Sequence, residues 1–333
     1  MKLPFGYAAF LMPGMYVFKI ILLKKGKIMK NQRVAVLLTC HNRKAKTLDC
    51  LASFYRAVFP SEYTFDIFLT DDGSTDGTGE ALKKLYPQIT LIQGSGNLFW
   101  AGGMRMAWES AMRECSYDAF LLLNDDVMLN SDFLLNLMKT EEHSLQKRGK
   151  KGIYSGATVD ETTGIVSYGG SKIKANHIVM KSQLLSPREF PQECEITNAN
   201  ILWISKNVVD AVGIFDDKYI HGIADYDYSL RAYKKNIPVY LAPSVCGTCT
   251  NDHGKNWKKG DVPLKERVAY LKSHKGLAYR EYMYYLKRHF PLFVPYSFFM
   301  LWMKTFFPFF WDRFKKTEVM ANNYPIEKKK NYA

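Results

Sequence analysis

The feature that most constrains this fold is a regular alternation of short apolar runs and helical stretches between residues 34 and 123. Four short runs predict strands, at residues 34–38, 65–69, 90–93 and 119–123, and the first of them is apolar throughout and is expected to be buried. Helical spacing of apolar residues fills the intervals, at residues 48–58, 78–86 and 101–114. Such alternation predicts the α/β class, with a Rossmann-like, mostly parallel sheet flanked by helices.

The pattern continues less regularly beyond residue 130. We expect helices at 131–148, 206–212 and 225–235, strands at 200–204 and 238–242, and short β pieces in the glycine-rich segment 149–180. Residues 263–290 are predicted to be helical, and residues 291–314 form an aromatic tail.

Polar clusters follow the predicted strands. They are Thr39–Arg43, Asp71–Thr78, the glycine-rich stretch from Gly94 to Arg105, and Asn124–Asp126. Because ligands of parallel α/β sheets bind beyond the carboxyl ends of the strands, we expect these clusters to form one site.

Each acidic cluster has two interpretations when taken alone. Asp71 and Asp72 either accept a hydrogen bond from a nucleobase or cap a helix. Asp125 and Asp126 are either an ordinary surface pair or ligands that hold Mg²⁺ or Mn²⁺ on a diphosphate. Asp225 and Asp227 lie at the start of a predicted helix, where they would provide a general base or cap the helix. His253 is a metal ligand or a solvated loop residue.

The glycine-rich stretch excludes two common phosphate-binding motifs. Its glycines, at 94, 96, 102 and 103, do not have the GxGxxG spacing, and no GxxxxGK[ST] motif occurs in the chain. Phosphate binding would therefore depend on a metal ion and on Arg or Lys side chains.

The charge is concentrated at the two ends of the chain. Lys and Arg number 46 against 32 acidic residues, a net charge of +14. Residues 1–33 carry +7, residues 255–333 carry +11, and the centre carries −4. Basic ends around an acidic centre favour a membrane surface over nucleic acid as the partner.

The N-terminal segment and the cysteines bear on the cellular compartment. Residues 1–32 are apolar and basic but interrupted by proline and glycine, which indicates either an anchor or an over-extended start before Met29. Six irregularly spaced cysteines without a secretory signal predict reduced thiols in the cytosol. The Cys246–Cys249 pair lacks the second pair that a structural zinc site needs.

The aromatic tail combines Trp, Tyr and Phe with Lys and Arg, a composition typical of helices lying in a membrane interface. The alternatives are packing on the core or on a second copy of the chain, which would form a homodimer through the C-terminal helices. Stacking on single-stranded nucleic acid is disfavoured by the acidic centre.

The motifs together resemble family 2 glycosyltransferases, in particular rhamnosyltransferase-type bacterial members. The matching residues are Thr39–Arg43, Asp71–Thr78, Gly96–Gly103, Asn124–Asp126 and Asp225–Asp227. The resemblance covers residues 33–255 and implies a GT-A fold there, between an N-terminal segment (1–32) and a C-terminal helical, membrane-associating region (256–333).

The resemblance also implies roles for particular residues. Asp225 would be the catalytic base, and Asp126 and His253 would hold Mn²⁺ or Mg²⁺. Trp203 and Asp227 would lie at the acceptor. The residues implied for the nucleotide-sugar are Thr39, Asn42, Arg43, Asp71, Asp72, Asn97, Gly102, Gly103, Arg105, Asn124 and Asp125. Two positions depart from the family pattern: Asn124 opens the DxD-like motif, and Ala224 replaces the usual Glu before the base.

The implied activity is inverting transfer of a sugar from a UDP- or dTDP-sugar to a glycan or lipid-linked acceptor, in cell-surface polysaccharide synthesis. It would occur in the cytoplasm at the inner face of the cell membrane. One alternative is a nucleotidyltransferase that makes a nucleotide-sugar, although the glycine-rich loop expected directly after its first strand is absent here. Another is an inactive relative that binds nucleotide-sugars.

Overall fold

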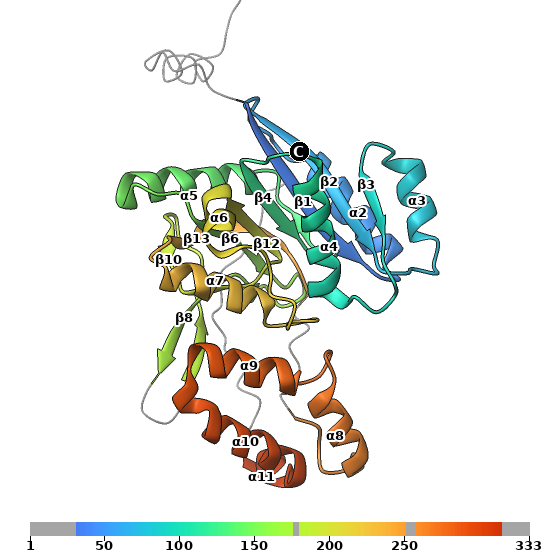
Figure 1. The fold of residues 1–333 in the computed structure, drawn as a ribbon, viewed down its shortest axis with the longest axis vertical. Coiled ribbons are helices and arrows are strands. Elements are labelled where there is room, and N and C mark those ends of the chain that lie inside the picture. The colour runs from blue at the N-terminus through green and yellow to red at the C-terminus, as the bar shows by residue number, and fades with distance from the viewer. Residues whose placement is uncertain (1–30, 176–179, 251–256, 315–333) are drawn as a thin grey trace, which may run out of the picture. The chain divides into compact units, whose positions relative to one another are not determined.

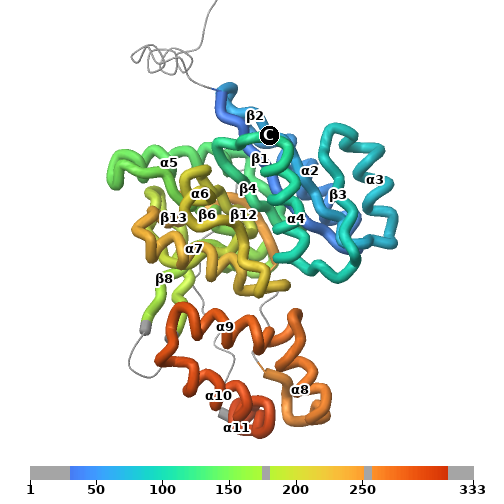
Figure 2. Tube along the Cα trace, viewed as in Figure 1, coloured from blue at the N-terminus to red at the C-terminus, as the bar shows by residue number. Residues whose placement is uncertain are grey.

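The computed structural model describes residues 31–175, 180–250 and 257–314, and those from Gln32 onward form one compact unit (Figures 1 and 2). The predictions of an N-terminal anchor or a later start fall on residues outside this description. Ten strands form the main sheet: β1 (Gln32–Cys40), β2 (Tyr63–Asp71), β3 (Thr90–Gln93), β4 (Ala119–Leu123), β5 (Met128–Leu129), β6 (Ile153–Val159), β7 (Val166–Tyr168), β10 (Gln192–Glu193), β12 (Ile201–Ser205) and β13 (Val239–Thr248).

The strand order is β10-β13-β6-β12-β4-β1-β2-β3, with β5 beside β13 and β7 beside β6. Strands β1 to β4 pair in parallel, as predicted, whereas β12 runs antiparallel to both β4 and β6. The sheet is therefore mixed and mostly parallel in its N-terminal half, and the predicted α/β class is confirmed.

Helices cover both faces of this sheet (Figure 1). They are α2 (Lys44–Tyr55), α3 (Thr78–Leu85), α4 (Phe99–Glu114), α5 (Phe133–Arg148), α6 (Lys206–Val212) and α7 (Ala224–Lys234). Successive strand side chains point to opposite faces, so Val36 and Leu38 join a core with α2, α3 and α5. Leu37 and Leu122 join a second core with α4, α6 and α7.

The carboxyl ends of the parallel strands lie side by side. Cys40 of β1 pairs with Asp71 of β2, and Asp71 pairs with Gln93 of β3. Leu37 pairs with Leu122, which places Asn124 at the same edge. This register brings together the polar clusters after β1, β2, β3 and β4.

The C-terminal part is helical but more divided than the sequence indicates. It contains α8 (Leu264–Lys272), α9 (Tyr279–His289), a 3-10 turn η1 (Pro291–Phe293), α10 (Val294–Phe306) and α11 (Phe309–Phe314). The stretch 263–290, predicted to be helical, is divided into two helices by a non-helical segment at residues 273–278. Ser273 is extended and Ala278 has a left-handed φ of 44°, while a side chain at Gly276 would collide with the Tyr270 carbonyl.

Helix α10 packs against both α8 and α9 (Figure 2). Tyr285 and Leu286 of α9 enter the core that α4 and α7 share. Within the described ranges, no helix combines the length and the apolar character needed to cross a membrane. A separate three-stranded sheet is formed by β8 (Gly170–Ala175), β9 (Met180–Leu184) and β11 (Ile196–Thr197).

Candidate active site

The acidic pair after β4 is held by a cation from the first loop. Arg43 donates from Nη1 to Asp126 Oδ2 (2.8 Å) and to Asp125 Oδ1 (3.3 Å). Thr47 Oγ1 donates to the other oxygen of Asp125 at 3.3 Å. Burial raises the pKa of Asp125 to about 6, against the lowering effect of Arg43. Asn124 Oδ1 accepts from the indole of Trp100 at 2.8 Å.

These carboxylates suit a divalent cation that also has phosphate oxygens to bind. Hard cations such as Mg²⁺ take oxygen ligands, typically one or two carboxylates together with substrate phosphates. The burial that raises the pKa of Asp125 reflects a carboxylate that its surroundings compensate incompletely, and a cation would supply that compensation. Among the described residues, no three His, Cys, Asp or Glu side chains gather as a metal site. His253, the other predicted ligand, lies outside the described residues.

Asp72 organises the glycine-rich loop. Its Oδ1 accepts from the Gly96 amide (2.7 Å), and its Oδ2 accepts from the Leu98 and Phe99 amides (2.9 and 3.0 Å). Its side chain thus caps the start of α4, where the helix dipole favours a negative charge. Asp71 similarly accepts from the Ser74 amide at 2.9 Å. Both carboxylates are buried. Asp72 caps α4, whereas Asp71 binds an amide in the turn before α3.

The predicted glycines act in packing. A side chain at Gly103 would collide with Thr39, so this glycine lets α4 lie close against β1. The Gly102 amide is 3.4 Å from the carbonyl oxygen of Ile220, to which it donates. Arg105 donates from Nη1 to the carbonyls of Tyr219 (2.7 Å) and Asp216 (3.1 Å). Gly102 and Arg105 therefore hold the loop before α7.

The two asparagines have different positions. Asn42 has a left-handed φ of 50°, and its Oδ1 accepts from the Thr75 amide at 2.7 Å. It thus joins the loops after β1 and β2. Asn97 is exposed in the glycine-rich loop, where its amide donates to Ser95 Oγ at 3.4 Å.

Asp225 stands in the first turn of α7. Its Oδ2 accepts from the Ala199 amide (3.1 Å) and its Oδ1 from the Tyr226 amide (2.9 Å). Burial raises the pKa of Asp225 to about 6, and these amide hydrogen bonds limit the rise. A carboxylate with a pKa near 6 is suited to accept a proton at neutral pH.

Hydrogen bonds to two adjacent residues, Ala199 and Asn200, link Asp225 to the segment that carries the acidic pair. The Asn124 amide donates to the Asn200 carbonyl at 3.1 Å, and the next residue back, Ala199, donates to Asp225. Asn200 Nδ2 also donates to Cys249 Sγ (3.4 Å), which lies 3.6 Å from Asp126 Oδ1. The structure therefore brings Asp225, Asp125 and Asp126 into one neighbourhood, although they are distant in sequence.

The two residues predicted at the acceptor do not reach a site. Trp203 lies within β12, where its fully buried ring meets Tyr63 edge-on. Asp227 is also fully buried and binds Arg231, Arg288 and His289. Both predicted acceptor roles are corrected, because neither side chain is accessible to a ligand.

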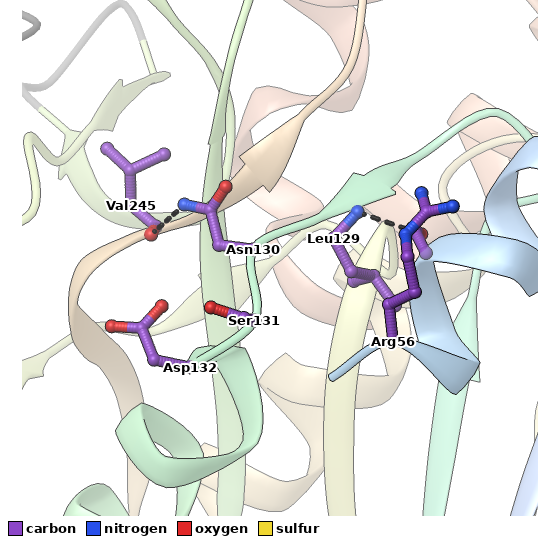
Figure 3. Close-up of a pocket in the computed structure, with 7 residues that line it drawn as sticks. Arg56, Leu129, Asn130, Ser131, Asp132 and Val245 are labelled. Atoms are coloured by element: carbon purple, nitrogen blue, oxygen red, sulfur yellow. Dashed lines mark hydrogen bonds between the residues drawn. The ribbon is translucent and has the colours of Figure 1, made fainter. Parts of the chain in front are cut away.

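Two hollows lie away from these residues. One of about 640 Å³ is lined by Ser53, Arg56, Leu129, Asn130, Ser131, Asp132 and Val245 (Figure 3). In it, Ser53 and Asn130 already hydrogen-bond the backbone at Leu129 and Val245. A smaller one adjoins Lys172 and Tyr233. Neither contains a predicted site residue.

Sequence reasoning missed several neighbours of the site. His41 donates from Nδ1 to the Asp72 carbonyl at 2.6 Å, Trp100 orients Asn124, and Ala199 binds Asp225. Cys249 lies beside Asp126. The position of His41 and Trp100 within the quoted motifs was a usable signal. The backbone amide of Ala199 and a cysteine just after β13 carry none.

Comparison with known proteins gives a partial match. Residues 35–144 match the model of the family described as glycosyl transferase family 2. A mannosyltransferase from Pyrobaculum calidifontis, in complex with GDP-Man and Mn²⁺, is similar in structure at 16% identity and a TM-score of 0.46, covering 73% of this chain and 66% of that one. S. aureus TarS 1–349 is similar at 14% identity and a TM-score of 0.44, covering 66% and 60%. This chain thus spans less than two thirds of either structure, and no curated protein matches it.

Proposed function

We propose that this chain, whose residues 35–144 belong to glycosyltransferase family 2, transfers a sugar from a nucleoside-diphosphate sugar to an acceptor hydroxyl with inversion at the anomeric carbon. The observation that carries the proposal is the hydrogen-bonded connection between Asp225 and the Asp125–Asp126 end of β4. It supports an arrangement in which a candidate base acts near a candidate diphosphate and metal site.

Asp125 and Asp126 would hold Mn²⁺ or Mg²⁺, which when bound supplies positive charge for the diphosphate leaving group. Arg43 already lies against both carboxylates and would share that charge. The loop residues that Asp72 orders would border the donor, because Gly96 and Leu98 are fixed beside the end of β2.

Asp225 would take the proton from the acceptor hydroxyl as its oxygen attacks the anomeric carbon. The new carbon–oxygen bond forms on the face opposite the leaving group, and the nucleoside diphosphate departs with the electron pair of the broken bond. One displacement needs a single base and no carboxylate nucleophile, in contrast to the retaining glycosidases.

A UDP- or dTDP-sugar as donor, and a glycan or lipid-linked acceptor in cell-surface polysaccharide synthesis, complete the proposal. A thermal-shift panel of UDP-glucose, dTDP-rhamnose and GDP-mannose with Mn²⁺ should identify the donor, because a ligand stabilises the protein in proportion to RT ln(1 + [L]/Kd). Slow release of nucleoside diphosphate from that donor should follow.

Asp225→Asn should abolish this release and leave nucleotide binding intact. Normal turnover in the variant would reject Asp225 as the base. Pyrophosphate release from a nucleoside triphosphate and a sugar phosphate would favour the nucleotidyltransferase, and binding without any turnover would favour the inactive relative.

We also propose that the enzyme works at the cytoplasmic face of the membrane. In support, large apolar side chains are exposed on η1, α10, α11 and the turn between α10 and α11: Leu292, Tyr296, Phe298, Phe299, Phe306, Phe307, Phe309 and Phe310. Lys304 and Arg313 stand in the same helices. Exposed aromatic residues among cations suit an interface with anionic lipid.

Phosphatidylglycerol vesicles should therefore sediment the full chain. The combined change Phe298→Ser, Phe299→Ser and Phe309→Ser should abolish sedimentation, whereas Phe190→Ser, an exposed aromatic outside these helices, should not. A triple variant that sediments normally would reject the proposal. Loss of a dimer in sedimentation velocity, with vesicle binding unchanged, would assign the surface to a second copy of the chain.

A further inference from the structure

The loop that leads into Asp225 is fixed from two sides. This loop, residues 213–223, connects α6 to α7 and contains no regular structure. From one side, α4 contacts it: the Ala101 amide donates to the Ile220 carbonyl at 3.1 Å, and Arg105 donates to the carbonyls of Asp216 and Tyr219. These contacts hold the carbonyl side of the loop.

From the other side, a carboxylate of the C-terminal region holds the amides. Glu281 of α9 is 3% exposed. Its Oε2 accepts from the Ile220 amide at 3.0 Å and from the His221 amide at 3.4 Å. Its Oε1 lies 2.5 Å from His274 Nδ1, so the carboxylate is itself oriented from the turn before α9.

Ile220 is therefore bound through both of its backbone groups, by α9 at its amide and by α4 at its carbonyl. Three residues later Ile223 adopts a left-handed φ of 70°, and α7 begins at Ala224 with Asp225 in its first turn. A displacement at residue 220 would be passed on through this strained turn to the base.

Helix α9 has separate attachments to α7, which do not involve Glu281. Arg288 Nη1 and His289 Nε2 bind Asp227 at 3.0 and 2.8 Å, and Leu286 is buried in the core. Removing the Glu281 carboxylate should thus loosen the 213–223 loop while α9 remains in place.

We propose that Glu281 is a positioning residue, which holds the 213–223 loop so that Asp225 meets the acceptor hydroxyl in the reactive geometry. The C-terminal region thereby contributes to catalysis through its α9 helix. The inference depends on the proposed function for the role of Asp225, but the loop contact itself can be tested without activity.

The experiment compares Glu281→Ala and Glu281→Gln with Glu266→Ala, which changes an exposed glutamate of α8 in the same region. Hydrogen–deuterium exchange should become faster in residues 216–223 of Glu281→Ala and stay unchanged in α7. Release of nucleoside diphosphate should lose about 10- to 100-fold in kcat, as expected for a misplaced reacting group. The Kd for UDP or dTDP with Mn²⁺ should stay within about threefold, because uniform binding is preserved.

Glu281→Gln keeps an acceptor oxygen without the charge and should be intermediate in both measurements. Glu266→Ala should match the wild type. If Glu281→Ala does not fold, the glutamine variant carries the same comparison.

Unchanged exchange in residues 216–223 would overturn the contact, and faster exchange with an unchanged kcat would overturn its catalytic role. A loss in nucleotide affinity as large as the loss in kcat would also overturn it, since that indicates general damage to the site. If the wild-type chain turns over none of the panel donors, the proposed function fails, while the exchange data still decide whether Glu281 holds the loop.

Discussion

The Asp225 carboxyl is the residue on which the proposed chemistry depends. Burial raises its pKa to about 6, and a base is active only when deprotonated. The rate of nucleoside diphosphate release should therefore rise about tenfold per pH unit below pH 6 and level off above about pH 7. Initial rates with saturating donor and Mn²⁺ between pH 4.5 and 8 would measure this.

Asp125 complicates that profile, because burial raises its pKa to about 6 as well. Nucleotide binding with Mn²⁺ should be measured over the same pH range, so that the loss caused by protonating Asp125 can be separated from the loss of the base. A rate that is flat between pH 5 and 7 at saturating nucleotide would contradict Asp225 as the base.

Asp72 supports the site through three backbone amides. Asp72→Ala should lower the free energy of unfolding by about 2 kcal/mol, because the amides of Gly96, Leu98 and Phe99 lose a charged acceptor. Urea unfolding would measure the loss. Asp76→Ala removes a more exposed acceptor at the start of α3 and should cost less; a larger cost there would contradict the importance assigned to Asp72.

The residue contacts explain which site assignments the sequence could support. Acidic residues at strand ends were recognisable, because chain polarity places all four parallel strand ends at one edge. Their partners were not, since Asp72 binds amides about 25 residues later and Asp227 binds α9 about 60 residues later. Trp203 was assigned to the acceptor through the resemblance alone, whereas in β12 its ring lies fully buried in the core.

At the scale of elements, strands were easier to predict than helix boundaries. The runs at 90–93 and 119–123 coincide with β3 and β4, because short segments with adjacent apolar residues between turns match the length of a strand. The break between α8 and α9 was missed. It depends on the close approach of Gly276 to Tyr270, which is a contact and not a periodicity.

The contact between α4 and β1 gives a prediction for an element. Gly103→Ala would place a methyl group against Thr39 and push α4 away from the sheet. The free energy of unfolding should fall by about 1–3 kcal/mol, as in other overpacked cores. Chemical denaturation would measure it, with Gly222→Ala as the matched control, because that position has open space around it. Equal stability of the two variants would show that α4 can shift without cost.

At the scale of the whole molecule, α9 joins the C-terminal helices to α7 of the main α/β fold through Asp227. Burial alone would raise the pKa of this carboxyl, but His289, Arg231 and Arg288 lower it to about 2. A folded-state pKa below the ordinary value of 3.8 means that the ionised form stabilises the fold. The ionised Asp227 carboxylate contributes about 2 kcal/mol to the free energy of unfolding. This contribution is complete above about pH 4 and is lost as the pH falls toward 2.

Asp227→Asn should consequently destabilise the protein at pH 7 by about 3 kcal/mol, since three cationic or polar partners lose a buried charge. The difference from the wild type, measured by urea unfolding, should narrow between pH 4 and pH 2.5, because the wild-type carboxyl is then increasingly protonated. Asp210→Asn breaks an exposed pair with Lys206 and should change stability little at any pH. If Asp227→Asn is no less stable than the wild type at pH 7, the cost of desolvating the Asp227 carboxylate is at least as large as the stabilisation from its ion pairs. The attachment of α9 must then come from its apolar contacts alone.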